Sequence, residues 1–164
     1  MLLATLIALS LPQVADAPLS CRAIAINLPQ GMDGWASPAP AVAGANPAEA
    51  TLLAPGSAVS ATLLPASGVT YAARPEKPGA ATSYGGVFAF DVSRAGRYRV
   101  ALGSAAWIDV LRGTTPVASA THGHGPTCST IRKMVDFDLT PGRHLVQIAG
   151  SEAAAVTLMV TPVG

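Results

Sequence analysis

The sequence predicts an all-β fold: an antiparallel β-sandwich or jelly-roll-like domain of about nine strands. From Ser57 onward, short runs of alternating polar and apolar residues follow one another, separated by turn residues. The chain holds 16 Gly and 14 Pro, and no long stretch repeats its apolar residues with the helical period of 3.6. Half of the 164 residues are apolar, which is enough for one domain with a hydrophobic core.

The chain divides into three segments. We expect a signal peptide at residues 1–17, a loop-rich N-terminal arm at residues 18–56 and the β-sandwich domain at residues 57–164. The arm is rich in Pro, Gly and Ala and lacks periodicity, and we expect Trp35 to anchor it. The nine strands are predicted at residues 58–64, 69–73, 86–92, 97–102, 107–111, 116–120, 130–139, 143–148 and 154–161.

The N-terminus has the features of an export signal. Residues 1–11 are apolar apart from Thr5 and Ser10, and they lead into Ala15-Asp16-Ala17, which is similar to a signal-peptidase site. The apolar run is too short to span a bilayer, which takes about 20 residues. The sequence therefore predicts a periplasmic or secreted protein, with no transmembrane segment in the mature chain.

The chain has two cysteines, Cys21 and Cys128. In an exported chain, two cysteines are most simply explained by one disulfide, which here would tie the N-terminal arm to the domain. An alternative stays open, because Pro18-Leu19-Ser20-Cys21 is a degenerate lipoprotein motif and would anchor the protein to a membrane through a lipid on Cys21.

A motif occurs twice, near Phe90 and near Phe137. In each copy Phe-Asp-[Val/Leu] precedes Gly-Arg-[Tyr/His]-x-Val, and we interpret each copy as a β-hairpin with one face in the core. The predicted core faces hold Phe90, Val92, Tyr98, Val100 and Leu102, and in the second copy Phe137, Leu139, His144, Val146 and Ile148. The predicted wet faces hold Arg97, Arg99, Arg143, Asp136 and Asp138. His144 stands where Tyr98 stands, so we expect it to be a core side chain.

The repeated motif and the strand Trp107-Ile108-Asp109-Val110-Leu111 between its copies resemble the prepeptidase C-terminal type of exported β-sandwich domain, over residues 86–163. A longer similarity rests on Pro75-Glu76-Lys77-Pro78-Gly79, Tyr84-Gly85-Gly86, Ala106-Trp107-Ile108-Asp109-Val110, His122-Gly123-His124-Gly125-Pro126-Thr127-Cys128 and Ile131-Arg132-Lys133. In these segments the chain is similar to short exported bacterial proteins of unknown role, some of which carry the name homogentisate 1,2-dioxygenase. That name implies a metal-dependent oxidoreductase.

Two of the three histidines, His122 and His124, are candidate metal ligands. In an extended segment they point to the same side, so both imidazoles can bind one ion of Fe, Cu or Zn. The cupin pattern that this spacing resembles needs a carboxylate four or five residues further on, but Cys128 stands there. The third ligand would have to come from elsewhere in the fold, and the candidates are Asp109, Asp136 and His144.

The sequence contains none of the familiar nucleophile or phosphate-loop motifs, so no catalytic residue is predicted. Trp107 and Asp109 share a strand face and are the candidate ligand-binding pair. A net charge of +1 argues against nucleic acid as a partner and leaves a protein or a carbohydrate. The leading hypothesis is an exported, non-catalytic binding or structural module without a cofactor. The alternative is a small metal-dependent dioxygenase that uses His122 and His124.

Overall fold

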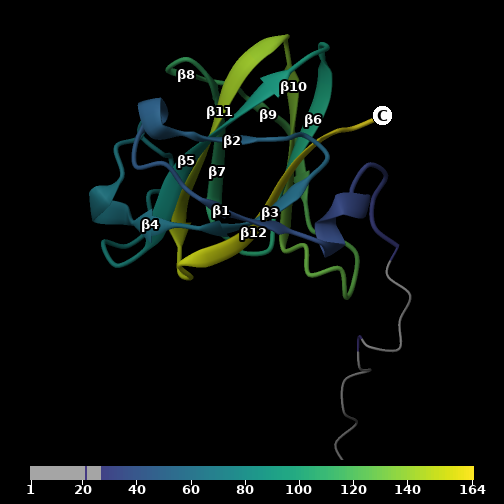
Figure 1. Cartoon of the computed structure of the whole chain (residues 1–164), viewed down its shortest axis with the longest axis horizontal. Coiled ribbons are helices and arrows are strands. Elements are labelled where there is room, and N and C mark those ends of the chain that lie inside the picture. The colour runs from purple at the N-terminus through teal and green to yellow at the C-terminus, as the bar shows by residue number, and fades with distance from the viewer. Residues whose placement is uncertain (1–20, 22–26) are drawn as a thin grey trace, which may run out of the picture.

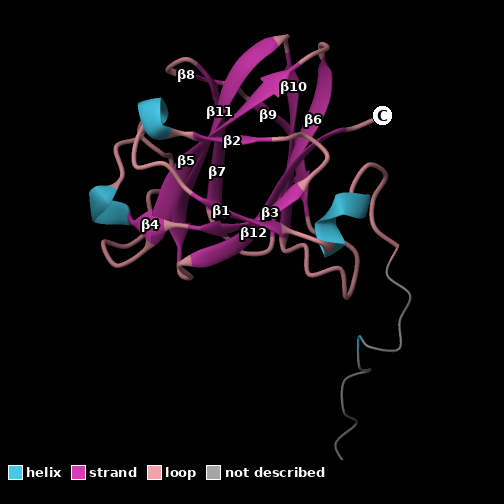
Figure 2. Ribbon diagram, in the orientation of Figure 1, coloured by secondary structure: helices cyan, strands magenta, loops and turns pink. Residues whose placement is uncertain are grey.

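The computed structural model describes residue 21 and residues 27–164, which form two packed β-sheets (Figures 1 and 2). The strand order is β1-β3-β12-β6-β10-β9 in the first sheet and β2-β5-β11-β7-β8 in the second, where β4 also pairs with β5. The first sheet contains β1 (Ala39–Val42), β3 (Ala58–Thr62), β6 (Gly96–Leu102), β9 (Ser119–Gly123), β10 (Lys133–Leu139) and β12 (Ala155–Pro162). The second contains β2 (Thr51–Leu53), β4 (Leu64–Pro65), β5 (Tyr84–Val92), β7 (Trp107–Arg112), β8 (Thr115–Pro116) and β11 (Gly142–Ser151). Connections include the 3-10 helices η2 (Asp33–Ala36), η3 (Pro47–Glu49) and η4 (Ala66–Gly68).

The sandwich-like all-β fold is confirmed, but the sheets are mixed rather than purely antiparallel. Strands β1 and β3 pair in parallel, as do β2 and β5. A parallel pair needs a crossover connection, and residues 43–57 supply it by running through the second sheet as β2. The described residues contain 12 strands rather than about nine, because the segment expected as a loop-rich arm contributes β1 and β2, and the predicted strands at 58–64 and 116–120 are each divided in two, while 69–73 forms none.

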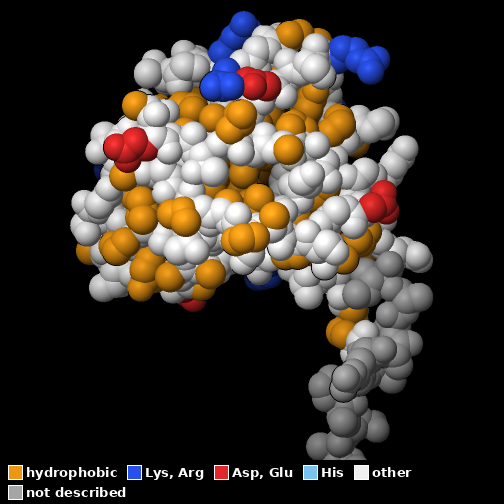
Figure 3. Space-filling model, in the orientation of Figure 1, with side chains coloured by type: hydrophobic (Ala, Val, Ile, Leu, Met, Phe, Trp, Pro, Cys, Tyr) orange, Lys and Arg blue, Asp and Glu red, His pale blue; other side chains and the backbone are white. Residues whose placement is uncertain are grey.

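Strands β1 and β2 are edge strands of the two sheets, and each has one large apolar side chain that is exposed. Val42 is 58% exposed and Leu52 is 56% exposed. Figure 3 shows apolar side chains spread over the face that carries β1, β2 and β3, with few charged groups among them. The residues of the expected signal peptide, 1–17, and residues 18–20 of the lipidation motif lie outside the described residues.

The prediction that each repeated motif forms a hairpin is wrong. In the first copy β5 belongs to the second sheet and β6 to the first, and in the second copy β10 belongs to the first sheet and β11 to the second. Each copy is therefore an arch that joins the two sheets. The arches pair with each other, since β5 pairs with β11 and β6 pairs with β10, both antiparallel. The alternation of polar and apolar residues identifies the buried face but not the neighbouring strand.

Reciprocal ion pairs mark the pairing of the two arches. Asp91 of the first copy binds Arg143 of the second, at 2.8 and 2.9 Å. The corresponding Asp138 of the second copy binds Arg97 of the first, with both distances 2.9 Å. In both pairs, the Asp of one copy binds the Arg of the other. The two copies are thus related by an approximate twofold arrangement.

The core lies between the sheets and holds the side chains that the period of two predicted. Phe90, Val100, Val146 and Ile148 have no exposed surface, and Tyr98 is only 6% exposed. The remaining predicted core residues are also buried: Val92, Leu102, Phe137, Leu139 and His144. The arches place both copies of the motif in one shared core.

His144 is a core side chain, as predicted. It is 1% exposed, its ring centre lies 5.7 Å from that of Phe90, and its Nδ1 lies 3.1 Å from the Gly142 carbonyl oxygen. Asp136, in contrast, was expected on a wet face and is only 5% exposed. Arg99 makes two hydrogen bonds to its carboxylate, at 2.7 and 2.8 Å, which compensates for the loss of water.

Residues 69–73 were predicted as a strand and form a loop instead. Both the Ala72 and the Ala73 backbone N–H groups donate to Oε1 of Gln147, and Nε2 of Gln147 donates back to the Ala73 carbonyl. The Tyr71 hydroxyl donates to the Ile148 carbonyl at 3.0 Å. This fully buried glutamine satisfies backbone groups that a neighbouring strand would otherwise bind. The loop thereby covers the outer face of the second sheet at β11.

The predicted strand at residues 116–120 is divided between the two sheets. Thr115 and Pro116 form β8 beside β7 in the second sheet, while β9 begins at Ser119 in the first sheet beside β10. Pro116 cannot donate to a neighbouring strand, which favours a short edge strand here. The crossing from β8 to β9 closes one edge of the sandwich.

The segment before β1 covers the outer face of the first sheet. Trp35, in η2, is 4% exposed and packs with Met32, Ala101 and Met159, as expected for an anchor. Its indole N–H lies 3.0 Å from both the Ser129 carbonyl oxygen and the Thr130 hydroxyl oxygen. These contacts join the N-terminal segment to residues 124–132, the loop between β9 and β10.

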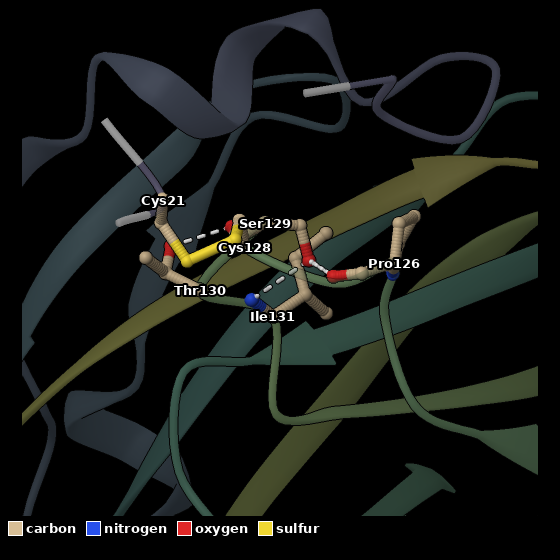
Figure 4. Close-up of a disulfide and its surroundings, with 6 residues drawn as sticks. All are labelled: Cys21, Pro126, Cys128, Ser129, Thr130 and Ile131. Atoms are coloured by element: carbon tan, nitrogen blue, oxygen red, sulfur yellow. Dashed lines mark hydrogen bonds between the residues drawn. A yellow bond between two sulfur atoms is a disulfide. The ribbon is translucent and has the colours of Figure 1, made fainter. Parts of the chain in front are cut away.

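The predicted disulfide between Cys21 and Cys128 is confirmed (Figure 4). The sulfur atoms are 2.03 Å apart and the Cα atoms 5.3 Å apart. Ser129 holds the same loop, because its hydroxyl donates to the Pro126 carbonyl and accepts from the Ile131 N–H. Because Cys21 is paired with Cys128, it has no free thiol to carry a lipid. A disulfide is compatible with a protein outside the cytoplasm.

Candidate functional site

Three adjoining pockets form a groove along the edge of the sandwich where β7 and β8 approach β9 and β10. We call it the edge groove, and the strands that border it are labelled in Figure 1. The first pocket, about 220 Å³, shares His122 and Lys133 with the second, about 350 Å³. The second shares Trp107, Ile108 and Ser119 with the third, about 460 Å³. Trp107 therefore stands in the middle of the groove.

The Trp107 side chain is held by polar contacts. Its indole N–H donates to Oδ1 of Asp109 at 2.9 Å, two residues further along the same strand face. The Nζ atoms of Lys77 and Lys133 lie 4.9 and 4.8 Å from the ring centre. Ammonium groups at this distance are attracted to the electron-rich face of an indole. Two ammonium groups from distant parts of the chain therefore lie close to the same indole ring.

Asp109 combines burial with an unsatisfied oxygen. Its Oδ2 atom is buried and has no hydrogen-bond partner among the described residues. Burial raises the pKa of this carboxyl group, and the charge of Glu76 raises it further, although the Trp107 hydrogen bond and Lys133 oppose both effects. Burial and the charge of Asp109 also raise the pKa of Tyr71. The hydrogen bond from the Trp107 indole to Asp109 shows that the predicted pair is in direct contact.

Lys133 links the first two pockets. It begins β10, and its Nζ donates to the Ala106 carbonyl at 3.1 Å while it lies over the Trp107 ring. Burial lowers the pKa of Lys133, the nearby charge of Lys77 lowers it further, and Asp109 opposes the shift. Two ammonium groups are thus held close enough to repel each other.

Both predicted histidines line the first pocket. His122 lies on β9 opposite the core residue Val135, so it faces the groove. His124 follows the strand, and its Nδ1 lies 2.8 Å from the Arg132 carbonyl oxygen. Nη1 of Arg132 lies 3.2 Å from the same nitrogen, and because a carbonyl only accepts while a guanidinium only donates, Nδ1 forms a hydrogen bond with one of the two at a time.

The structure does not bring the proposed third metal ligands to the two histidines. Asp136 lines a small pocket with His122 but without His124, and both of its carboxylate oxygens accept hydrogen bonds from Arg99. His144 is in the core, and Asp109 lines the third pocket rather than the first. Among the described residues, no three His, Cys, Asp or Glu side chains are grouped as a metal site.

We predict that the histidine pair makes little difference to stability. Because both side chains are exposed, replacing His122 and His124 together with Ala should change the free energy of unfolding by no more than about 0.5 kcal/mol. Thermal melting with and without Fe, Cu or Zn checks this. A metal that binds the folded state at a hundredfold excess over its Kd would add about 2.7 kcal/mol. Such a gain, lost in the double variant, would contradict the prediction and favour the metal-dependent enzyme.

Sequence reasoning missed most of the charged residues of the groove. Glu76, Lys77, Arg132 and Lys133 are exposed or half-buried, and they lie in two of the segments that carry the similarity to short exported proteins, but no chemical motif marks them as site residues. They reach Trp107 or the histidines only because the loop of residues 66–83 and strand β10 converge on β7. A lysine carries no signal of its own in a sequence, since most lysines are solvated surface residues.

Comparisons with known proteins give no assignment. No protein-family model and no curated protein matches the chain. Within the described residues, no helix is long and apolar enough to cross a membrane. A function for this protein has to be inferred from the geometry of the groove.

Proposed function

We propose that this protein is an exported, non-catalytic binding module that holds a carbohydrate chain in the edge groove. The observation that carries the proposal is the groove itself, with the fixed Trp107 side chain at its centre. Aromatic side chains beside a few well-placed polar groups are typical of sites that bind polar organic ligands. Hydroxyl, carboxylate, imidazole and ammonium groups all line the same groove, from Ser119, Glu76, His122 and Lys133.

The arrangement of the carboxylates favours binding over cleavage. Hydrolysis of a glycosidic bond uses a pair of carboxyl groups that reach the bond from either side. Asp109 is poorly placed for this task, because Trp107 binds its Oδ1 and its Oδ2 is buried. A general acid has to come within hydrogen-bond reach of the leaving oxygen. We therefore assign Asp109 to the orientation of Trp107.

Export is the second part of the proposal. The disulfide between Cys21 and Cys128 supports it, because disulfides persist mainly outside the cytoplasm. The expected signal peptide at residues 1–17 supports it from the sequence. A module of this kind meets carbohydrate chains at the cell surface or in the periplasm.

Oligosaccharide binding tests the proposal. We expect oligosaccharides to bind the oxidised protein, and Trp107→Ala to weaken binding about tenfold or more, because this half-buried aromatic side chain lies at the centre of the groove and aromatic side chains carry much of the binding energy of such sites. Leu52→Ala is the control, because Leu52 is an exposed apolar residue on β2, outside the groove. Calorimetric titration measures the affinity, and circular dichroism verifies the fold of each variant.

Two results would count against the proposal. Equal loss of affinity in the Trp107 and Leu52 variants would place the ligand outside the groove. Shortened oligosaccharides after incubation, detected by mass spectrometry, would show an enzyme and contradict the assignment of Asp109.

A further inference from the structure

Lys77 and Lys133 are the feature of the groove that goes beyond a general binding site. They come from a loop and from β10, 56 residues apart by their numbers (133 − 77), yet both ammonium groups lie within 5 Å of the centre of one indole ring. Among the described residues, no carboxylate lies within 4 Å of either Nζ, since the ion pairs found there all involve arginines. The two charges are therefore held together without an anionic partner.

The charged side chains that line the first two pockets with the lysines are positive, and Asp109, outside these two pockets, is the negative charge that acts on Lys133. Arg132 lines the first pocket beside His122 and His124, and Lys133 lines both of the first two pockets. The carboxylates, Asp109 and Glu76, line only the third pocket. The groove thus has a positive half, from Arg132 to Lys77, and an acidic end. A positive half of this kind attracts anionic groups and repels cations.

The two lysines favour an acidic sugar over a neutral sugar at the Trp107 ring. Stacking of a neutral sugar on Trp107 requires a bare ring face, but ammonium groups lie over the ring. A neutral sugar would have to displace an ammonium group and forgo its attraction to the indole. An acidic sugar meets the ammonium groups where they already lie and forms charge-assisted hydrogen bonds with them.

We propose that the groove recognises an acidic carbohydrate, with a carboxylate or sulfate group of the chain bound between Lys77 and Lys133. This inference rests on the proposed function, because it specifies the ligand of the same groove. The anionic oxygen atoms accept hydrogen bonds from both ammonium groups, and Trp107 acts as a positioning residue for them. His122 and Ser119 lie next to this point and contact the neighbouring sugar ring.

The experiment compares four probes on the oxidised full-length protein: oligogalacturonate as the carboxylate probe, a sulfated dextran oligomer as the sulfate probe, a neutral dextran oligomer, and polyglutamate as an anion that is not a carbohydrate. We expect oligogalacturonate or the sulfated oligomer to bind at least tenfold more tightly than the neutral oligomer. Lys77→Ala and Lys133→Ala should each weaken that binding about tenfold, as expected for loss of one charge-assisted contact. Binding should also weaken between about 0.05 and 0.5 M NaCl, because salt screens exposed charges.

Arg94→Ala is the matched control, because it removes one exposed positive charge from the turn between β5 and β6. It should leave the affinity unchanged. Equal binding of neutral and acidic oligomers, unaffected by the lysine variants, would overturn this inference and leave the proposed function intact. Binding of none of the carbohydrates would overturn both. Polyglutamate binding as tightly as the acidic oligomers, with the same dependence on Lys77 and Lys133, would retain the anion site and overturn carbohydrate as the ligand class.

Discussion

Reduction of the Cys21–Cys128 disulfide is expected to lower the free energy of unfolding by about 4 kcal/mol. The bond joins residues 107 apart in sequence, and closing a loop of that size restricts the unfolded chain by up to roughly 4.7 kcal/mol. For a chain of this length, such a loss corresponds to a melting temperature lower by roughly 10–15 °C. Calorimetric melting with and without a reductant measures it.

The double variant Cys21→Ser/Cys128→Ser provides the control for reduction. It should melt at the temperature of the reduced protein and show no further response to reductant. An unchanged melting temperature after verified reduction would mean that contacts of the N-terminal segment, such as those of Trp35 with Ser129 and Thr130, restrain the chain without the bond.

Asp136→Ala should lower the free energy of unfolding by about 3 kcal/mol. The side chains of Asp136 and Arg99 are 7% and 18% exposed, and two hydrogen bonds join them. Removing the carboxylate leaves a largely buried guanidinium group without its counter-charge, which is the costly way to break a buried pair. Thr121 also loses the acceptor of its hydroxyl, at 3.1 Å. Urea unfolding of the variant and the parent measures the difference.

Asp138→Ala is the matched control, because Asp138 also pairs with an arginine of β6 but is exposed. Its effect should be much smaller, since water replaces the lost partner. If both variants destabilise the protein equally, burial does not determine the strength of these pairs.

The ion pair of Asp136 with Arg99 also makes the free energy of unfolding depend on pH. Burial by itself would raise the pKa of Asp136, but Arg99 and the Thr121 hydrogen bond lower it below its usual value. The ion pair therefore contributes fully above the unfolded-state pKa of about 3.9, and its contribution is lost as pH falls through the lower folded-state pKa. The acid loss of stability measured by urea unfolding should be smaller in Asp136→Asn than in the parent.

The sequence predicted the buried faces of the strands well, because burial follows from the period of two within each strand. It did not predict which strands pair. The repeated motif looks the same whether its two halves form a hairpin or an arch, and contacts between the copies, such as those of Asp91 with Arg143 and of Arg97 with Asp138, distinguish the two. Those contacts join different copies, so no local pattern contains them.

In the groove, too, contacts between residues close in sequence were predicted, and contacts between residues far apart in sequence were not. Trp107 and Asp109 are two residues apart on one strand, and their proximity was predicted. Lys77 reaches the indole through a loop whose course depends on Gln147, a buried side chain on β11, and Lys133 reaches it from β10 in the other sheet. The prediction at residues 69–73 was wrong for the same reason, since one distant glutamine satisfied the backbone there.

The interlocked arches also have a consequence for how the protein folds. In the first arch, β5 pairs with β11, which begins 50 residues after β5 ends (142 − 92), and β6 pairs with β10, which begins 31 residues after β6 ends (133 − 102). A chain that ends before β10 therefore leaves β6 without either of its neighbours, β10 and β12, and β5 without β11. We expect the two arches to acquire structure together, in one cooperative step whose rate is limited by closing this long loop.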